Sequence, residues 1–420
     1  MNQYKLIVQT FTVLSRTEAR KLLAWMLLLL GMSKNIQAQR LPNPDSVEML
    51  LNDMTLQIEI TTGINDMYNF KFQRAESQFL WLRHHYPTHP LPYFLMGLSH
   101  WWKIMPNANI KTYDEPFLNY MDSAIYFAEK QFEKYPEGNK KRIEAAFFLS
   151  AAWGFKGRLH SERKNWTKAT VASRKSLNHL EYCKNKGELS PELLFGDGLF
   201  NYFAPWIREN YKMLRPIMLL FDKGDKKLGL EQLETVVKEA FYAKVEAQTF
   251  LMRIYAFEEK QLEKALVIGE YLHKTFPDNP YFQRYYARLL YSQGLLPEMK
   301  VVCLDLMDKI NKKQFGYEAT SGRYACFFLG NYYQLLERDL NKAEDYYLKA
   351  IAYSEEVEEL EAGYYHYSLL NLARIYKEKG DFERAIEYIE KVLDNADSDS
   401  YAYKEAKALK KEYKKWKKKK

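Results

Sequence analysis

Residues 371–393 read NLARIYKEKGDFERAIEYIEKVL, and this stretch decides the fold. Its apolar and small residues recur three or four positions apart on either side of Gly380, which is the period of a helix with one buried face. Ala373 and Ala385 are small residues within the two apolar faces. The stretch therefore predicts two amphipathic helices that approach each other closely where these small side chains lie.

The same arrangement recurs along the chain. Three stretches carry an alanine twelve residues before a proline: Ala75 and Pro87, Ala124 and Pro136, Ala265 and Pro277. The first-helix pattern of a large, a small and an aromatic residue occurs at Leu329, Gly330 and Tyr333, and again at Leu372, Ala373 and Tyr376. In these residues the chain resembles the tetratricopeptide repeat (TPR) family, in which a proline closes each helix pair.

This resemblance implies an all-α fold, a TPR-like superhelical solenoid of antiparallel helix pairs. We expect an irregular solenoid over residues 46–398, after a short linker at 39–45 and before a C-terminal helix with a basic tail at 399–420. The turns near Leu262 and Leu340 are one residue longer than usual, and the segment KIMPNANIKTYDEP is inserted at 103–116. The composition agrees, because only 18 Gly and 14 Pro in 420 residues leave few turns for a many-stranded β fold.

The formal charge of +8 belongs to the two ends of the chain. Residues 1–38 carry +4 and residues 410–420 carry +7, so the remaining 371 residues carry −3. A nucleic-acid-binding domain is expected to carry its basic stripe on the fold, so we expect no nucleic-acid partner. We expect the tail from Lys410 to be a solvated extension that contributes nothing to the fold and makes weak contact with anionic membranes.

Residues 1–38 have the order of an export signal. Arg20 and Lys21 precede the apolar run Leu22–Met32, and polar residues lead to a cleavage site after Ala38. We therefore expect a signal peptide at 1–38 and a periplasmic or otherwise exported protein of a bacterial type. The alternative is an N-terminal helix that packs on the body.

Residues 186–244 depart from the repeat pattern. Glycines and prolines, among them Gly198, Pro205 and Gly229, are expected to interrupt helical periodicity there. Two interpretations remain open for the apolar run Met213–Phe221, a core-filling segment or an exposed contact with a partner or membrane, and we favour the core.

Catalytic and metal-binding patterns are not found in the sequence. His84, His85 and His89 cluster, but Pro87 breaks the helix that would hold two of them on one face. The segment Asp394–Ser400 lacks the glycine and the bidentate glutamate of a calcium loop. We therefore predict no catalytic residues, no metal site and no cofactor.

The resemblance also points to a binding groove. In the TPR family the first helices line the concave face, and the residue that follows the small packing residue points into the groove. On this reasoning the groove residues are Arg253, Arg284, Arg288, Tyr291, Asn331, Arg374 and Lys377. Guanidinium groups favour carboxylates, which predicts a protein or peptide partner with an acidic segment. The alternative is that these arginines are solvated and bind no ligand.

These observations favour a non-enzymatic protein–protein interaction scaffold of the cell envelope that holds a peptide or protein segment in the concave groove. Two alternatives remain. One is a hydrolase or lyase built on a helical array with its site in 186–244, and the other is a cytoplasmic TPR regulator.

Overall fold

The computed structural model describes residues 47–210, 222–361 and 363–417. The chain divides into two compact units, residues 1–59 and 60–420. In the described part of the first unit, the short 3-10 turn η2 (Leu50–Asn52) precedes α3, and Asp53 Oδ1 accepts the backbone N–H of Leu56 at 2.8 Å. The expected signal peptide (1–38), the linker (39–45) and the run Met213–Phe221 lie outside the described residues.

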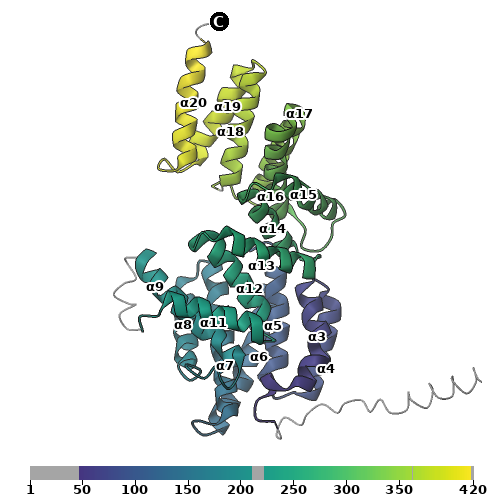
Figure 1. Ribbon diagram of the computed structural model, residues 1–420, viewed down its shortest axis with the longest axis vertical. Coiled ribbons are helices and arrows are strands. Elements are labelled where there is room, and N and C mark those ends of the chain that lie inside the picture. Colours follow the sequence, from purple (N-terminus) through teal and green to yellow (C-terminus); the bar gives the residue numbers. More distant parts are fainter. Residues whose placement is uncertain (1–46, 211–221, 362, 418–420) are drawn as a thin grey trace, which may run out of the picture. The chain divides into compact units, whose positions relative to one another are not determined.

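The all-α prediction is confirmed, because every regular element of the described residues is helical (Figure 1). The helices are α3 (Met54–Tyr68), α4 (Phe72–His85), α5 (Pro90–Ile104), α6 (Asp114–Lys134), α7 (Lys140–Glu162), α8 (Trp166–Leu180), α9 (Leu194–Asn210), α11 (Lys226–Glu239), α12 (Lys244–Arg253), α13 (Leu262–Thr275), α14 (Pro280–Ser292), α15 (Leu296–Asn311), α16 (Ala319–Tyr332), α17 (Leu340–Glu356), α18 (Gly363–Glu378), α19 (Phe382–Asn395) and α20 (Tyr401–Lys417). No described helix is both long enough and apolar enough to cross a membrane.

Side-chain caps fix where many of these helices begin. Asn279 accepts the backbone N–H groups of Tyr281 and Phe282, and Pro280 follows it at the first helical position of α14. Asp339 and Asp381 cap α17 and α19 in the same way. Gly380 has φ of 78°, which lets the chain turn sharply between α18 and α19.

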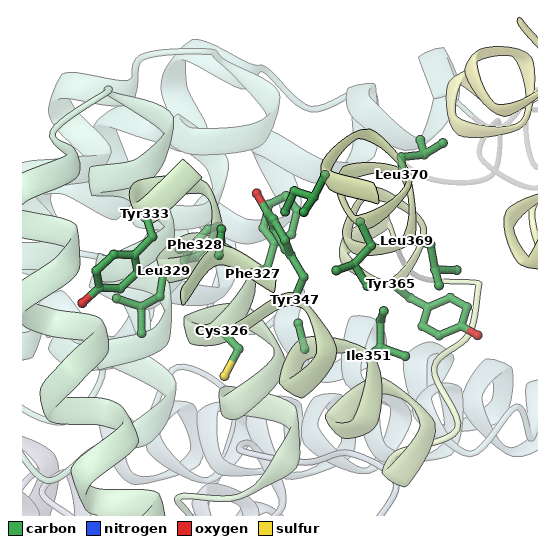
Figure 2. Close-up of a cluster of buried hydrophobic side chains, with 14 of the residues drawn as sticks. Cys326, Phe327, Phe328, Leu329, Tyr333, Tyr347, Ile351, Tyr365, Leu369 and Leu370 are labelled. Atoms are coloured by element: carbon green, nitrogen blue, oxygen red, sulfur yellow. The ribbon is translucent and has the colours of Figure 1, made fainter. Parts of the chain in front are cut away.

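Helices that follow one another in sequence pack together from α11 to α20, as a stack of helix pairs requires. The first helices of successive pairs also pack on each other, α14 on α16, α16 on α18 and α18 on α20. Figure 2 shows the side chains between α16, α17 and α18, where Tyr347 and Leu369 are fully buried. Gly330 makes this approach possible, because a Cβ there would lie 2.6 Å from the Tyr347 ring.

The two long turns predicted near Leu262 and Leu340 are π turns at the ends of first helices. The π turn η5 (Ile254–Glu258) continues α12, and η6 (Tyr333–Glu337) continues α16. A π turn holds one more residue than an α turn, so the extra residue widens the helix end and the next helix still packs normally.

The inserted segment 103–116 contacts helices far away in sequence. Asn107 Nδ2 donates to Glu318 Oε2 at 3.0 Å, and Asn109 Nδ2 donates to the carbonyl of Val357 at 3.1 Å. Arg284 Nη1 donates to the carbonyl of Pro106 at 2.9 Å. This loop therefore covers part of the face formed by α14 and the residues that begin α16.

The expectation that glycines and prolines interrupt the helices of 186–244 holds at Gly224, which has φ of 70° just before α11, but is wrong for Gly198, Pro205 and Gly229. Pro205 lies inside α9, a continuous helix of 17 residues. Gly198 and Gly229 are at the crossing of α9 and α11, where a Cβ on Gly229 would lie 2.5 Å from the backbone nitrogen of Tyr202. Gly198 and Gly229 therefore mark a close helix crossing rather than helix ends.

The tail also differs from the prediction. Helix α20 continues to Lys417, Tyr413 is 1% exposed, and Lys410 Nζ lies 2.9 Å from Glu390 Oε1. The first part of the basic tail therefore packs on the preceding pair and contributes to the fold.

Candidate binding site on the first helices

A cavity of about 680 Å³ lies along the first helices of the last repeats. Its lining comes from α14, α16, α18 and α20 and consists of Arg288, Tyr291, Arg323, Tyr324, Phe327, Asn331, Gly363, Tyr364, Tyr367, Asn371, Arg374 and Glu405. Because α14, α16 and α18 pack side by side, each contributes the residues of one exposed face to this single cavity.

Four of the seven predicted site residues line this cavity: Arg288, Tyr291, Asn331 and Arg374. Arg288, Asn331 and Arg374 directly follow Ala287, Gly330 and Ala373, which are packed in the core. Tyr291 is about one turn after Arg288 on the same face.

Aromatic rings form much of the wall. Tyr291 stacks on Phe328 with ring centroids 4.6 Å apart and an angle of 23° between the planes. Tyr364 of α18 packs against α16, with its ring centroid 4.6 Å from that of Tyr324 and 4.9 Å from that of Phe327. Burial raises the pKa of Tyr364, so its phenol stays protonated and can donate a hydrogen bond.

Arg323 is the most buried charge of the wall. It is 5% exposed, and its Nη2 pairs with Glu359. Its Nε and Nη1 are buried and have no hydrogen-bond partner. The guanidinium also lies 5.2 Å from the centroid of the Tyr324 ring, and unpaired buried donors of this kind cost free energy.

Arg288 and Arg374 differ in how they are held. The Arg288 guanidinium lies 4.1 Å from the centroid of the Phe257 ring, and no described carboxylate forms an ion pair with it. Arg374 pairs with Glu405 and donates to Asn371 Oδ1. The lining thus holds three arginines and one glutamate, and only Arg374 has its charge neutralised by a lining residue.

The other three predicted site residues do not line the cavity. Arg284 is 6% exposed and donates to Pro106 and to Ser321 Oγ, so the inserted loop covers it. Arg253 lies beside Tyr281, and its electrostatic interaction with that side chain is the main reason that the pKa of Arg253 is raised. Lys377 pairs with Glu412 at 2.7 Å and lies over the Tyr413 ring.

Several lining residues were not predicted from the sequence, although a helical period would have found them. Tyr324 and Phe327 precede Asn331 at spacings of seven and four, and Tyr364, Tyr367 and Asn371 precede Arg374 at ten, seven and three. All of these spacings keep one face of a helix. The prediction extended its marker residues by one turn only at Arg284, Tyr291 and Lys377, and did not extend them along α16 or toward the start of α18.

The described residues contain no cluster of side chains that could hold a metal ion, and two of the cysteines are poor nucleophiles. Within 47–210, 222–361 and 363–417, no three His, Cys, Asp or Glu side chains are placed to hold a metal ion. Burial raises the pKa of the Cys183 and Cys326 thiols to about 12. His89, from the predicted cluster, is buried and its Nδ1 accepts the backbone N–H of Leu91 at the start of α5.

Comparison with known proteins identifies one repeat directly. Residues 368–400, which include the stretch that decides the fold, match the family model described as tetratricopeptide repeat. The chain therefore contains a tetratricopeptide repeat in its last helix pair. No curated protein sequence matches the chain.

Two solved structures are similar over much of the chain. Yeast Tom70 is 13% identical with a TM-score of 0.38, and the similarity covers 78% of this chain and 64% of that one. The human IFIT1 dimer with PPP-AAAA is 13% identical with a TM-score of 0.36, covering 76% of this chain and 68% of that one. This chain thus spans less than two thirds of the length of the Tom70 chain.

Proposed function

We propose that this protein is a non-enzymatic scaffold that binds an acidic segment of a partner protein in the cavity formed by α14, α16, α18 and α20. The observation that carries the proposal is Arg323, whose Nε and Nη1 are buried without partners in the cavity wall. Such donors cost free energy when they are unpaired, and a carboxylate is the group that satisfies them best.

The surroundings of Arg323 also suit a peptide. Arg288 adds a second cation on the same wall, and the rings of Tyr291, Tyr324 and Tyr364 give apolar area with polar tips. Tyrosine and arginine are the residues that dominate many protein–protein interfaces, because each buries a large area and still donates hydrogen bonds.

The alternatives receive less support. The cavity beside 186–244 contains no His, Asp or Glu among its described lining residues, so no described group there favours the hydrolase or lyase. The choice between a cell-envelope scaffold and a cytoplasmic regulator depends on residues 1–38. We propose export, and weak contact of the Lys-rich end with anionic membranes, from the sequence.

Fluorescence anisotropy tests the binding proposal. The probes are a labelled peptide of alternating Glu and Ser and a matched peptide of alternating Lys and Ser. We expect the acidic peptide alone to bind, and more weakly as salt increases.

The double variant Arg288→Glu/Arg323→Met should lose this binding. Arg384→Glu is the matched control, because Arg384 is on α19 outside the cavity lining and pairs with Asp381. Equal binding of both peptides, or undiminished binding by the folded double variant, would rule out the proposed site.

The location is tested separately on the native protein. We expect peptide mass spectrometry to recover no peptide from residues 1–38 and the protein to fractionate with the envelope. Abundant peptides that contain Lys5, in a cytosolic fraction, would support the cytoplasmic regulator instead.

A further inference from the structure

A second cavity, of about 460 Å³, lies between α7, α8 and α9. Helix α9 packs closely on α11, whereas neither α7 nor α8 packs closely along α9 in the described part of the chain. By contrast, α5 packs on α7, and α14, α16 and α18 pack on one another through their first-helix faces. The space between the pair α7–α8 and the pair α9–α11 is therefore left open and becomes the cavity.

The wall of this second cavity is apolar. Its aromatic lining consists of six half-buried side chains, Phe147, Phe155, Phe195, Phe200, Phe203 and Phe250. Two of the three serines in the lining pair within the wall, where Ser176 Oγ donates to the carbonyl of Ser150 at 2.7 Å. A wall with this much unburied aromatic surface gains free energy when an apolar molecule replaces water.

One charged side chain lies in this lining. Arg158 stacks over Trp101 at 4.7 Å and Phe250 at 5.5 Å, and its Nη2 has the weak acceptor Met105 Sδ at 3.9 Å. No described carboxylate forms an ion pair with Arg158. Burial is the main reason that the pKa of Arg158 is lowered, while the carboxylates of Glu246 and Glu162 act in the opposite direction.

We propose that the cavity between α7, α8 and α9 binds an apolar anion with a single chain, with the chain against the phenylalanines and the anionic head on Arg158. The volume is within the range of roughly 300–1,000 Å³ that is usual for small-molecule sites. A fatty acid and a single-chain alkyl phosphate share this chemistry, and guanidinium binds both carboxylate and phosphate. The site is separate from the cavity of α14, α16, α18 and α20.

Isothermal titration calorimetry on the full chain tests the inference with three probes: dodecanoate, dodecyl phosphate and dodecanol. We expect the anions to bind at about one molecule per chain and dodecanol to bind about tenfold more weakly, because it lacks the charge for Arg158. The tighter of the two anions identifies the head group of the natural ligand.

Three variants distinguish this cavity from the Lys-rich tail and from the cavity of α14, α16, α18 and α20. Arg158→Met should remove the preference for anions, while dodecanol binding stays. Ala151→Phe, a lining position on α7, should fill the cavity and abolish binding of all three probes while leaving the Lys-rich tail intact. Arg288→Met, in the other cavity, should change nothing.

Two outcomes with the wild-type protein and one with Ala151→Phe would overturn the proposal. Dodecanol binding as tightly as dodecanoate would remove the role of Arg158. Absence of binding would overturn the proposal as well. Binding that Ala151→Phe retains would assign the anions to the tail instead.

Discussion

Small residues in the first helices set the distance between helices. At Gly330 an added Cβ would lie 2.6 Å from Tyr347, whose hydroxyl donates to Gln334 and accepts from Asn371. The ring is held at both sides, so it has little freedom to move away. The close approach of α16 and α17 therefore depends on Gly330, together with Gly322, where an added Cβ would lie 2.8 Å from the Tyr353 ring on α17.

We predict that Gly330→Ala destabilises the protein by about 1–3 kcal/mol through overpacking, against the gain that alanine normally gives within a helix. Gly363→Ala is the matched control, because the nearest atom to its Cβ would be 3.9 Å away. Urea unfolding measures both. Equal stability of the two variants would mean that α16 and α17 are not as close as the structure places them.

A buried histidine makes stability depend on pH. Burial lowers the pKa of His273 to about 4, below the ordinary value of 6.5, and its ring stacks on Tyr286 at 5.3 Å. The folded state thus binds fewer protons than the unfolded state between these two values. The contribution of neutral His273 to the free energy of unfolding is fully present above pH 6.5 and is lost as the pH falls toward 4.

We predict that His273→Phe reduces this loss, because phenylalanine keeps the stacking and cannot be protonated. The Nδ1 of His273 is also buried without a partner, so little is lost at neutral pH. The measurement is the urea midpoint at about pH 7 and about pH 5 for both proteins. A parallel fall in the two midpoints would assign the acid sensitivity to other groups, such as His100, whose pKa is also lowered to about 4.

At the scale of the elements, α20 closes the stack. Tyr413 contributes a buried ring, and Lys410 and Lys377 form ion pairs between α20 and the preceding pair. The last half of α20 is thus a cap on the apolar face of the final repeat, as terminal elements of repeat proteins often are.

We predict that truncation after Leu409 lowers stability by about 2 kcal/mol or more, chiefly through the loss of the buried Tyr413 ring. Removal of residues 418–420 alone is the control and should leave the thermal midpoint unchanged. If both truncations behave alike, the contacts of Tyr413 do not stabilise the fold.

The sequence predicted the pairing of helices well because each pair leaves its own local pattern. Arg288, Asn331 and Arg374 were found because each follows a small core residue, and side-chain direction in a helix follows from position. Arg284 was predicted because it lies one turn before Arg288 on the same helix face, but its partner Pro106 is 178 residues away in sequence. No period within a helix indicates which distant segment covers it. The cavity between α7, α8 and α9 was unpredictable because no helical period shows how far apart two neighbouring pairs lie.

At the scale of the whole molecule, the inserted loop adds contacts that a simple stack lacks. Repeats in a stack usually contact only their neighbours, and such arrays can unfold in parts. Here Asn107 and Asn109 bind Glu318 and Val357, so residues 60–113 and the later repeats share hydrogen bonds. We expect these contacts to couple the unfolding of distant repeats.

We predict that Asn107→Ala/Asn109→Ala separates one unfolding transition into two, or broadens it, and speeds hydrogen exchange in α16. Asn119→Ala, on α6 away from these contacts, is the control. The measurement is differential scanning calorimetry together with hydrogen exchange. A single transition as sharp as that of the wild type would show that the loop lies on the later repeats without coupling them.

The π turns have a consequence for how such a chain tolerates change in its gene. Because η5 and η6 each accept one extra residue at the end of a first helix, a single inserted codon there leaves the packed faces of both helices in phase. A repeat of this kind has a variable length but a constant interior. Two chains could therefore diverge through insertions and deletions at these helix ends, lose any fixed period, and still preserve the same core.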